Sequence, residues 1–347
     1  MKIVVNNIAA SSGGALSVLQ DFYNYIKDND RKNEWIFLLS DNFIEETDNI
    51  KVIIRDDIKK SKFRKLAFDL VFGRNFINRM NADVVFSMQN IITFGVKAPQ
   101  VVYIHQPVPF QKLKKFSFLI KKERQMAIYQ YLIGIIIKKS AKKANKIIVQ
   151  TKWMKDEVQK QCRVNGVVNI LPSIEDLRAL KNFDDYSTRE FFYPSADIIY
   201  KNNDLIEQAC KILNRKGCKD FGVEITIENK KDTDNIKYLG RIDRKEVISK
   251  YNTKTLIFPS YIETFGYPLA EARQMGSIIL ASDCDFSREV LEGYENAYFF
   301  NPFDQYSLAD LMEKVIEGEI AKKDELYETL AYSNNTWSEV YDEVLSI

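Results

Sequence analysis

The sequence predicts an α/β protein of two domains, each built on a parallel sheet. Two series of short apolar runs, typical of buried parallel strands, alternate with amphipathic helical patterns along the chain. An acidic, irregular stretch near residues 170–188 separates the two series, and 347 residues are enough for two domains of ordinary size. We therefore expect a first domain over residues 1–172, a second over residues 173–334, and a final segment over residues 335–347.

Each series contains six expected strands. The helical pattern after Gly14 has an apolar face that includes Leu19, Phe22 and Ile26. Because helices alternate with strands, the connections should cross over the sheet and make both sheets parallel, as in Rossmann-like domains. The predicted strands cover residues 2–5, 35–39, 52–54, 84–87, 101–104 and 147–150 in the first domain, and 191–193, 224–227, 236–238, 256–258, 278–281 and 297–299 in the second. A last helix is expected over residues 337–344.

The composition is that of a soluble globular protein, with 46% hydrophobic and 28% charged residues. No apolar stretch approaches the eighteen or so residues of a membrane span, and the first residues lead directly into a strand, so we expect a cytoplasmic chain. The four cysteines have no CxxC spacing and His105 is the only histidine. The pattern therefore predicts neither a disulfide framework nor a metal site.

The net charge of +2 hides an asymmetry between the two halves of the chain. Residues 1–172 carry 29 Lys and Arg against 15 Asp and Glu, whereas residues 173–347 carry 21 against 33. The basic residues gather at residues 59–65 and 112–146, where large apolar side chains such as Phe118 and Leu119 alternate with them. This mixture suits the surface of an anionic membrane, each nearby Lys or Arg adding about 1 kcal/mol. Surface helices with solvated basic faces are the alternative, and no nucleic-acid-binding signature accompanies the patch.

Two carboxylates mark the most constrained stretch of the chain. Glu263 lies in a loop after the apolar run of residues 255–258, and Glu271 lies in the helix that Pro268 opens and Gly276 can end. Loops at the carboxyl end of parallel strands bind ligands, and the helix N-terminus near Gly266 suits a phosphate. Carboxylates accept hydrogen bonds from hydroxyls. The segment therefore predicts a site for a phosphorylated sugar.

This segment, Glu263-TFGYPLA-Glu271, resembles the donor-site motif of the family-4 retaining glycosyltransferases, in which seven residues separate two glutamates. The resemblance implies the GT-B fold, in which two Rossmann-like domains with parallel sheets face each other across a cleft and the last helix crosses back to the first domain. It also implies that Glu263 meets the donor sugar near the reacting carbon and that Glu271 holds the ribose hydroxyls. The backbone that would contact the diphosphate is that of Thr264, Phe265, Gly266 and Tyr267.

Two places in the first domain fit the same resemblance. Gly13 and Gly14 follow the first strand, where glycine lets the backbone approach a ligand closely, and they are similar to the Gly-Gly loop that faces the donor diphosphate in the family. A plain strand-to-helix turn is the alternative, and the absence of a third glycine argues against a nicotinamide cofactor. His105 lies just past a strand and resembles the family histidine that orients the donor sugar or the acceptor hydroxyl. A structural role for this lone histidine is the alternative.

The loop after the first strand of the second domain follows the family in one position and departs from it in another. Lys201 matches the family lysine directed at the diphosphate, but Pro194 and Ser195 occupy the place of the usual Gly-Arg pair. Because one expected cation is absent, Lys201 and the helix end at Gly266 should carry more of the leaving-group charge. Ser195 can still donate a hydrogen bond, and a lysine that only caps a surface loop is the alternative. The remaining donor-side residues are Asn202, beside Lys201, and Tyr238 and Gly240, where family members receive the nucleobase.

Together these residues predict a metal-independent transferase that moves a sugar from a nucleoside-diphosphate donor to an acceptor hydroxyl, with retention of configuration implied by the resemblance. The predicted catalytic residues are Glu263, His105 and Lys201, and no cofactor or metal is expected. The basic first half favours a lipid-linked acceptor, as in the synthesis of O-antigen, lipopolysaccharide or capsule. The chain would then act peripherally at the inner face of the cell membrane.

Other functions are alternatives at this stage. A nucleotide-sugar epimerase or a phosphorylase can share this fold, although an epimerase needs further acid and base residues. A non-catalytic sugar-binding protein would bind free sugar without nucleotide, and a membrane-surface scaffold would bind lipid regardless of changes at Glu263. Glycoside hydrolysis by the two carboxylates is not expected, because Glu271 would be directed at ribose rather than at a scissile bond.

Overall fold

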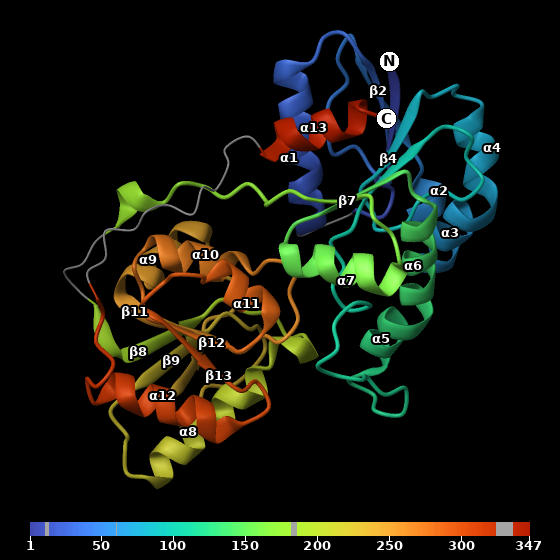
Figure 1. Cartoon of the computed structure of the whole chain (residues 1–347). Coiled ribbons are helices and arrows are strands. Elements are labelled where there is room, and N and C mark those ends of the chain that lie inside the picture. Colours follow the sequence, from blue (N-terminus) through green and yellow to red (C-terminus); the bar gives the residue numbers. More distant parts are fainter. Residues whose placement is uncertain (11–13, 60, 182–185, 324–335) are drawn as a thin grey trace. The chain divides into compact units, whose positions relative to one another are not determined.

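The computed structural model describes residues 1–10, 14–59, 61–181, 186–323 and 336–347, and it divides into two compact units. Unit 1 comprises Met1–Ser173 and Ser333–Ile347, and unit 2 comprises Ile174–Tyr332. Each unit is built on one sheet with helices packed against it (Figure 1). All strand pairs in both sheets are parallel, as the alternation of strands and helices predicts.

The sheet of unit 1 has seven strands in the order β3-β2-β1-β4-β5-β6-β7. The strands are β1 Lys2–Asn6, β2 Glu34–Leu39, β3 Ile50–Ile54, β4 Val84–Ser87, β5 Gln100–Tyr103, β6 Lys146–Val149 and β7 Val167–Asn169. The main helices are α1 Gly14–Asn29, α3 Lys62–Ala67, α4 Gly73–Asn78, α6 Gly134–Lys143 and α7 Lys152–Cys162, with the short α2 Asp56–Lys59 and α5 Arg124–Ala127 between them. Two π-helical segments, η1 Phe68–Phe72 and η2 Ile128–Ile133, continue α3 and α5.

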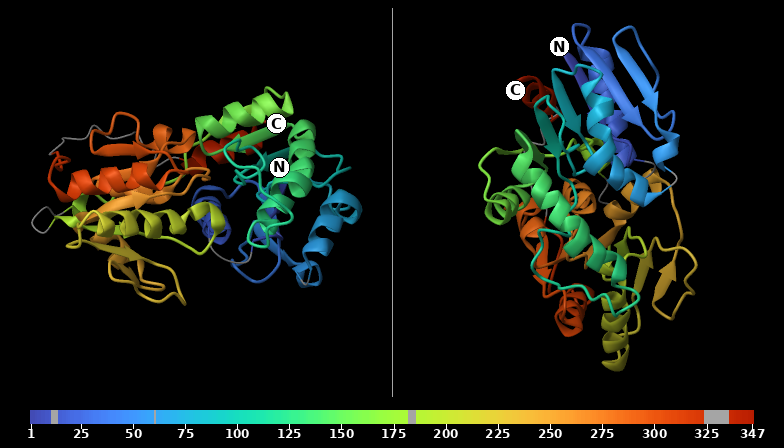
Figure 2. Two further views of the ribbon diagram at one scale, coloured as in Figure 1. Left: turned by 90° about the horizontal axis from the view of Figure 1, so that it is seen from below. Right: turned by 90° about the vertical axis from the view of Figure 1, so that its right-hand side faces the viewer.

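Helices cover both faces of this sheet, which explains why its central strands are mostly apolar (Figure 2). Alternate residues of a strand point to opposite faces. In β1, Ile3 and Val5 join a core that includes Phe22 of α1, whereas Val4 joins a second core with Ile77 of α4. The predicted apolar face of α1 is confirmed, because Leu19, Phe22 and Ile26 are all buried.

The last helix, α13 Thr336–Leu345, belongs to unit 1 and lies beside α1 (Figure 1). Val340 and Val344 are fully buried in the core that contains Phe22, and the Trp337 ring lies 5.5 Å from the Phe22 ring. The end of the chain therefore completes the core of the unit in which the chain begins.

The sheet of unit 2 has six strands in the order β10-β9-β8-β11-β12-β13. These are β8 Ser187–Tyr193, β9 Gly222–Ile225, β10 Ile236–Tyr238, β11 Lys254–Phe258, β12 Ile279–Ser282 and β13 Ala297–Phe300. The helices are α8 Asn203–Arg215, α9 Arg244–Thr253, α10 Tyr267–Gln274, α11 Asp285–Val290 and α12 Gln305–Ile316, with short 3₁₀ turns η3 Arg178–Leu180 and η4 Ile199–Lys201.

In each sheet the order of the strands reverses at one point. The reversal lies between β1 and β4 in unit 1 and between β8 and β11 in unit 2. Loops that leave the carboxyl ends of such neighbouring strands diverge and form a crevice in which open α/β sheets bind ligands. The strand order of unit 2 therefore predicts a ligand-binding crevice at the segments after Tyr193 and after Phe258.

A small test of this fold concerns the start of α12. The Asp304 carboxylate accepts a hydrogen bond from the Tyr306 backbone amide at 2.9 Å and so caps the helix. We expect Asp304→Ala to lower the free energy of unfolding by about 1 kcal/mol. Asp304→Asn should keep most of the stability that the cap contributes, because asparagine also caps helices. Urea denaturation measures both. Asp310→Ala, which removes an exposed pair with Lys314 in the same helix, is the control and should change stability by less than about 0.5 kcal/mol.

Candidate functional site

The loops that follow β8 and β11 bring together two residues predicted to act in catalysis. Lys201 stands at the end of η4 and Glu263 in the loop after β11, and the Lys201 Nζ atom lies 2.6 Å from Glu263 Oε1. The Ser260 hydroxyl donates to the same carboxylate oxygen at 2.7 Å. Both side chains of the ion pair are less than 20% exposed. The pair therefore forms a preorganised charged centre at the reversal point of the sheet.

Buried groups hold Lys201 in this position. The Tyr193 hydroxyl donates to the Lys201 backbone carbonyl at 3.0 Å. Burial, followed by the nearby charge of Glu263, raises the pKa of Tyr193 well above its ordinary value, so the hydroxyl keeps its proton. Asn202 has a left-handed φ of 59° and donates from Nδ2 to the carbonyls of Pro259 and Pro302 at 3.2 and 2.8 Å. Lys201 is thus held through its backbone carbonyl by Tyr193 of β8 and through its ammonium group by Glu263, while its neighbour Asn202 binds the loop after β11.

The helix predicted between Pro268 and Gly276 is present as α10, which begins at Tyr267. Gly266 precedes it with a φ of 89°, a left-handed conformation that favours glycine, and Pro268 stands in its first turn. Phe265 is buried and packs edge-on against Tyr267 at 5.5 Å, whereas Tyr267 is half-exposed and Thr264 is partly buried. The N-terminus of α10, which carries a partial positive charge, therefore follows Glu263 directly.

Glu271 lies inside α10 and is almost completely buried. Its Oε1 atom accepts a hydrogen bond from Arg244 Nη1 at 2.8 Å, and its Oε2 atom accepts one from the Tyr251 hydroxyl at 3.1 Å. Burial, followed by the Glu271 charge and this hydrogen bond, raises the pKa of Tyr251 well above its ordinary value. Neither Arg244 nor Tyr251 was predicted as a site residue, because the sequence around them does not differ from that of an ordinary surface helix.

A pocket of about 610 Å³ lies at the carboxyl ends of β8 and β9. Ser195, Thr226, Lys230 and Arg241 are among its lining residues, and a second pocket of about 620 Å³ shares Arg241 with it and includes Arg244. The Ser195 backbone amide donates to the Thr226 hydroxyl at 2.8 Å, and the Ser195 hydroxyl lies 2.8 Å from Asn203 Oδ1. Thr226 and Lys230 are further residues that the sequence analysis missed.

Tyr238 is the last residue of β10, and Gly240 directly precedes Arg241, which lines this pocket. The Tyr238 hydroxyl donates to Glu207 at 2.8 Å, and Lys230 binds the same carboxylate oxygen at 2.7 Å. Burial, together with the Glu207 charge, raises the pKa of Tyr238. Gly240 has a φ of 67°, so the chain turns there in a conformation that favours glycine.

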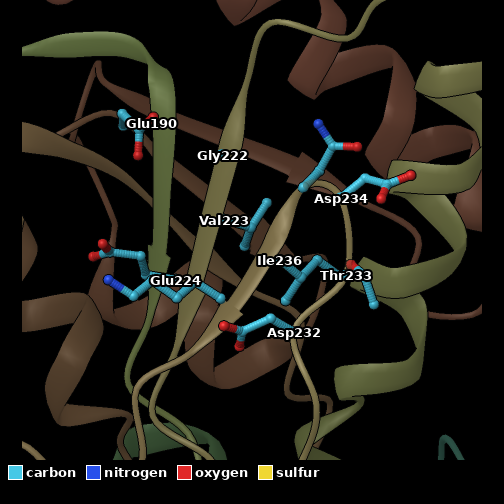
Figure 3. A pocket seen from close by; sticks show the side chains of 10 residues that line it. Glu190, Gly222, Val223, Glu224, Asp232, Thr233, Asp234 and Ile236 are labelled. Atoms are coloured by element: carbon cyan, nitrogen blue, oxygen red, sulfur yellow. The ribbon is translucent and has the colours of Figure 1, made fainter.

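A smaller pocket of about 290 Å³ lies along β9 and β10 and is lined by several acids (Figure 3). Its residues include Gly222 and Ile236, which begin these strands, so the pocket extends to the end of the sheet opposite the loops described above. Glu224 is paired with Lys250 at 2.8 Å and with Lys254 at 3.2 Å. Glu190 is likewise paired with Lys254 at 3.0 Å. Because the pocket reaches the opposite end of the sheet, we do not assign it to the donor.

In unit 1, the predicted glycine loop is only partly within the described residues. Gly13 lies outside them, and Gly14 is the exposed first residue of α1, where an added Cβ would meet no atom within 4 Å. Gly14 follows β1 and begins α1, as the sequence predicts. That this segment contacts a diphosphate, rather than forming a plain strand-to-helix turn, stays a prediction.

His105 follows β5, as predicted, and its ring is tied to the loop after β4. The His105 backbone amide donates to Asn90 Oδ1 at 2.7 Å, and the His105 Nε2 atom lies 3.3 Å from Asn90 Nδ2. Its Nδ1 atom is buried without a hydrogen-bond partner among the described residues. Although part of the side chain is accessible, desolvation lowers the pKa of His105 to about 4, so the imidazole is neutral at pH 7.

Within the described ranges, no cluster of three or more His, Cys, Asp or Glu side chains could hold a metal ion. No helix of these ranges is long and apolar enough to cross a membrane.

Residues 192–334 match the family model described as "Glycosyl transferases group 1". A stretch of 83 residues, 24% of this chain, is 36% identical to the serotype-specific mannosyltransferase WbdA of Escherichia coli, of which it spans only 10%. This partial match covers a small part of that relative.

Solved structures that are similar to the whole chain include WaaG and a sucrose-phosphate synthase. WaaG, a glycosyltransferase involved in lipopolysaccharide biosynthesis, has a TM-score of 0.66 at 14% identity, with complete coverage of both chains. Sucrose-phosphate synthase from Thermosynechococcus elongatus has a TM-score of 0.64 at 12% identity and covers 99% of this chain and 94% of its own. Such similarity shows the fold, and the predicted GT-B fold with two parallel-sheet, Rossmann-like units is confirmed.

Proposed function

We propose that this chain, whose residues 192–334 match the family model of the group 1 glycosyl transferases, transfers a sugar from a nucleoside-diphosphate donor to an acceptor hydroxyl, with retention of configuration and without a metal ion. The observation that carries the proposal is the ion pair of Lys201 and Glu263, which stands at the reversal point of the unit 2 sheet and directly before the N-terminus of α10. A cation and a helix N-terminus suit an anionic leaving group such as a diphosphate. A carboxylate suits the hydroxyls of the sugar that is joined to it.

The charge that develops in the reaction determines the role of Lys201. When the bond between the sugar carbon and the diphosphate oxygen breaks, negative charge grows on the diphosphate. An ammonium group has three N–H donors, so Lys201 can keep its hydrogen bond to Glu263 and still donate to a phosphate oxygen. The helix dipole of α10 adds to this stabilisation. Both groups are fixed before the reaction, which is the condition for electrostatic catalysis.

Glu263 has a separate role in this proposal. One of its oxygens is occupied by Lys201 and Ser260, while the other can accept hydrogen bonds from sugar hydroxyls. The acceptor hydroxyl attacks the sugar carbon from the face that the diphosphate leaves, and its proton passes to the leaving phosphate oxygen. This front-face course retains the configuration and requires no additional base. His105, neutral at pH 7, orients a hydroxyl rather than carrying charge.

The other donor residues divide between the ribose and the base. Glu271 accepts hydrogen bonds from the ribose hydroxyls, and the 610 Å³ pocket at the ends of β8 and β9 receives the nucleoside. The Ser195 hydroxyl takes part of the place of the missing arginine by donating to the diphosphate. The backbone around Gly240 contacts the base. Ser195 and Arg241 both line this pocket, which supports the proposed division of roles between these residues.

We further propose a lipid-linked acceptor at the inner face of the cell membrane, as in O-antigen, lipopolysaccharide or capsule synthesis. The support is a surface of unit 1 that we call the basic-apolar surface, formed by residues 112–139. Its apolar side chains are unusually exposed, among them Leu119 at 89% and Leu132 at 55%. Lys121 and Lys122 are exposed next to them. Exposed apolar groups among lysines match a surface of acyl chains and anionic headgroups.

The membrane proposal gives a measurable expectation. The double substitution Lys121→Ala/Lys122→Ala should weaken binding to vesicles that contain anionic lipid by about 30-fold, because each lysine contributes about 1 kcal/mol near such a surface. Vesicle co-sedimentation at low salt measures this. Lys219→Ala/Lys231→Ala, a pair of exposed lysines on unit 2, is the matched control and should leave binding unchanged. Equal binding by all three proteins would contradict the proposed surface.

A thermal-shift screen of the purified protein against UDP-, GDP- and dTDP-sugars tests the transferase proposal. A ligand present at 100 times its Kd stabilises the native state by about 2.7 kcal/mol, which corresponds to a rise in Tm of about 5–10 °C for a domain of this size. We expect one nucleotide class to produce this rise. Stabilisation by a free sugar without nucleotide, or by none of the compounds, would argue against the transferase.

A further inference from the structure

Arg244 in the first turn of α9 stands between two carboxylates from distant parts of the sequence. Its Nη1 atom donates to Glu271 Oε1 at 2.8 Å, while its Nε and Nη2 atoms lie 3.2 and 3.1 Å from Glu175 Oε2. One edge of the guanidinium thus faces the buried acid of α10, and another faces an exposed acid near the start of unit 2.

This arrangement differs from an ordinary surface ion pair because Glu271 is only 5% exposed. A buried carboxylate without partners is strongly unfavourable, and a hydrogen-bonded one is held in a defined orientation. The Tyr251 hydroxyl, itself buried, supplies the second partner at 3.1 Å. Each oxygen of Glu271 therefore has one fixed donor from the protein. Since each carboxylate oxygen accepts about two hydrogen bonds, one further donor can be added to each.

Arg244 also faces the space proposed for the nucleoside. It lines the 620 Å³ pocket with Arg241, Ile242 and Val247, and these three residues also line the 610 Å³ pocket at the ends of β8 and β9. About half of the Arg244 side chain is exposed. A ligand that occupies these adjoining pockets would meet Arg244, whose Nη1 atom donates to the Glu271 carboxylate.

We propose that Arg244 and Tyr251 are positioning residues that fix the Glu271 carboxylate so that its two remaining acceptor sites meet the two ribose hydroxyls of the donor, with Glu175 bracing the far edge of the Arg244 guanidinium. This inference rests on the proposed function and adds the residues through which the ribose contact is set. A planar guanidinium can bind two carboxylates along different edges at once, whereas a lysine offers one compact ammonium. The arrangement therefore favours arginine over lysine at position 244.

The test is calorimetric titration of the full chain with whichever of UDP and GDP binds better, since both carry the 2′- and the 3′-hydroxyl, and with its 2′,3′-dideoxy analogue. If Arg244 acts through the ribose contact, Arg244→Ala should weaken binding of the natural nucleotide about tenfold, which is the effect of losing a hydrogen bond to a charged group. The dideoxy analogue should lose less than threefold, because the contact is already absent. Arg244→Lys should recover part of the loss.

Tyr251→Phe provides a second, milder variant, because it removes only the hydroxyl. It should weaken binding of the natural nucleotide about fivefold and leave binding of the dideoxy analogue nearly unchanged. Arg189→Ala is the matched control, since Arg189 forms a comparably exposed ion pair with Asp220 where β8 begins. It should affect neither ligand. Thermal melts of each variant identify any loss that comes from unfolding.

The outcomes separate this inference from the proposed function. If the wild-type chain binds none of UDP, GDP and dTDP, the proposed function fails and the inference falls with it. If it binds dTDP alone, which lacks the 2′-hydroxyl, the contact to two ribose hydroxyls is wrong and the proposed function stands. If the wild type binds but Arg244→Ala and Tyr251→Phe bind equally well, or lose affinity equally for both ligands, the positioning role is wrong and the proposed function stands. Selective loss of the natural nucleotide supports both.

Discussion

Lys201→Met lowers kcat by about 10²–10³-fold and leaves the fold intact. The ammonium group lies 2.6 Å from Glu263 in a mostly buried setting, so it is fixed before the reaction and acts with little screening by solvent. Removal of one preorganised group that stabilises developing charge typically costs about 2.7–4 kcal/mol of transition-state stabilisation. Since the usual arginine at the position of Ser195 is absent, Lys201 has no neighbouring cation in the Gly-Arg place to take over its role.

Steady-state kinetics with the donor identified by thermal shift measures this loss. Lys254→Met is a matched control, because Lys254 is similarly buried and is paired with Glu190 and Glu224 in the same unit. The two substitutions should reduce stability by comparable amounts, and only Lys201→Met should reduce kcat. Similar activity losses in the two variants would show that the effect of Lys201 is structural.

Glu263→Gln should lower kcat about 100-fold with a small change in donor affinity, whereas Glu271→Gln should mainly weaken donor binding. The two carboxylates differ in their partners. Glu263 is held by Lys201 and Ser260 beside the leaving group, and Glu271 is held by Arg244 and Tyr251 inside α10. A group that acts on the reacting sugar changes kcat, and a group that binds a distant part of the donor equally in ground and transition states changes KM.

Glutamine keeps the size of the side chain and removes only the charge and half of the acceptor capacity, so it isolates these roles better than alanine. Donor affinity from calorimetry and kcat from initial rates separate the two effects. If both variants lose donor affinity equally and keep their turnover, the division of roles between the sugar and the ribose is wrong.

Much of the fold could be predicted from the sequence because buried parallel strands are continuous apolar runs. The apolar run of residues 255–258 predicted a strand, which is β11. Pro268 and Gly276 predicted the start and the end of the helix after it, which is α10. β7, Val167–Asn169, was not predicted, because its two valines stand between Gly166 and Asn169, which are typical of turns, and because the strand forms by pairing with β6. The same limit applies to the π-helical segments, which have no periodic signature.

The candidate site could be predicted residue by residue but not as an arrangement. Lys201 and Glu263 are 62 positions apart, and only the strand order of the unit 2 sheet brings their loops together. Arg244 and Tyr251 were missed because an arginine and a tyrosine in an amphipathic helix are common surface and core residues. Their role depends on the buried carboxylate of Glu271, whose partners lie 27 and 20 positions away.

The central claim is that the segment from Glu263 to Glu271 holds the donor, with the diphosphate at the N-terminus of α10. Hydrogen–deuterium exchange of the full chain, with and without the nucleotide sugar that stabilises it, tests this claim most directly. We predict that the ligand slows exchange of the backbone amides of residues 264–267 by about tenfold or more and leaves β3 of unit 1 unchanged. Unchanged exchange at residues 264–267 under saturating ligand would contradict the claim.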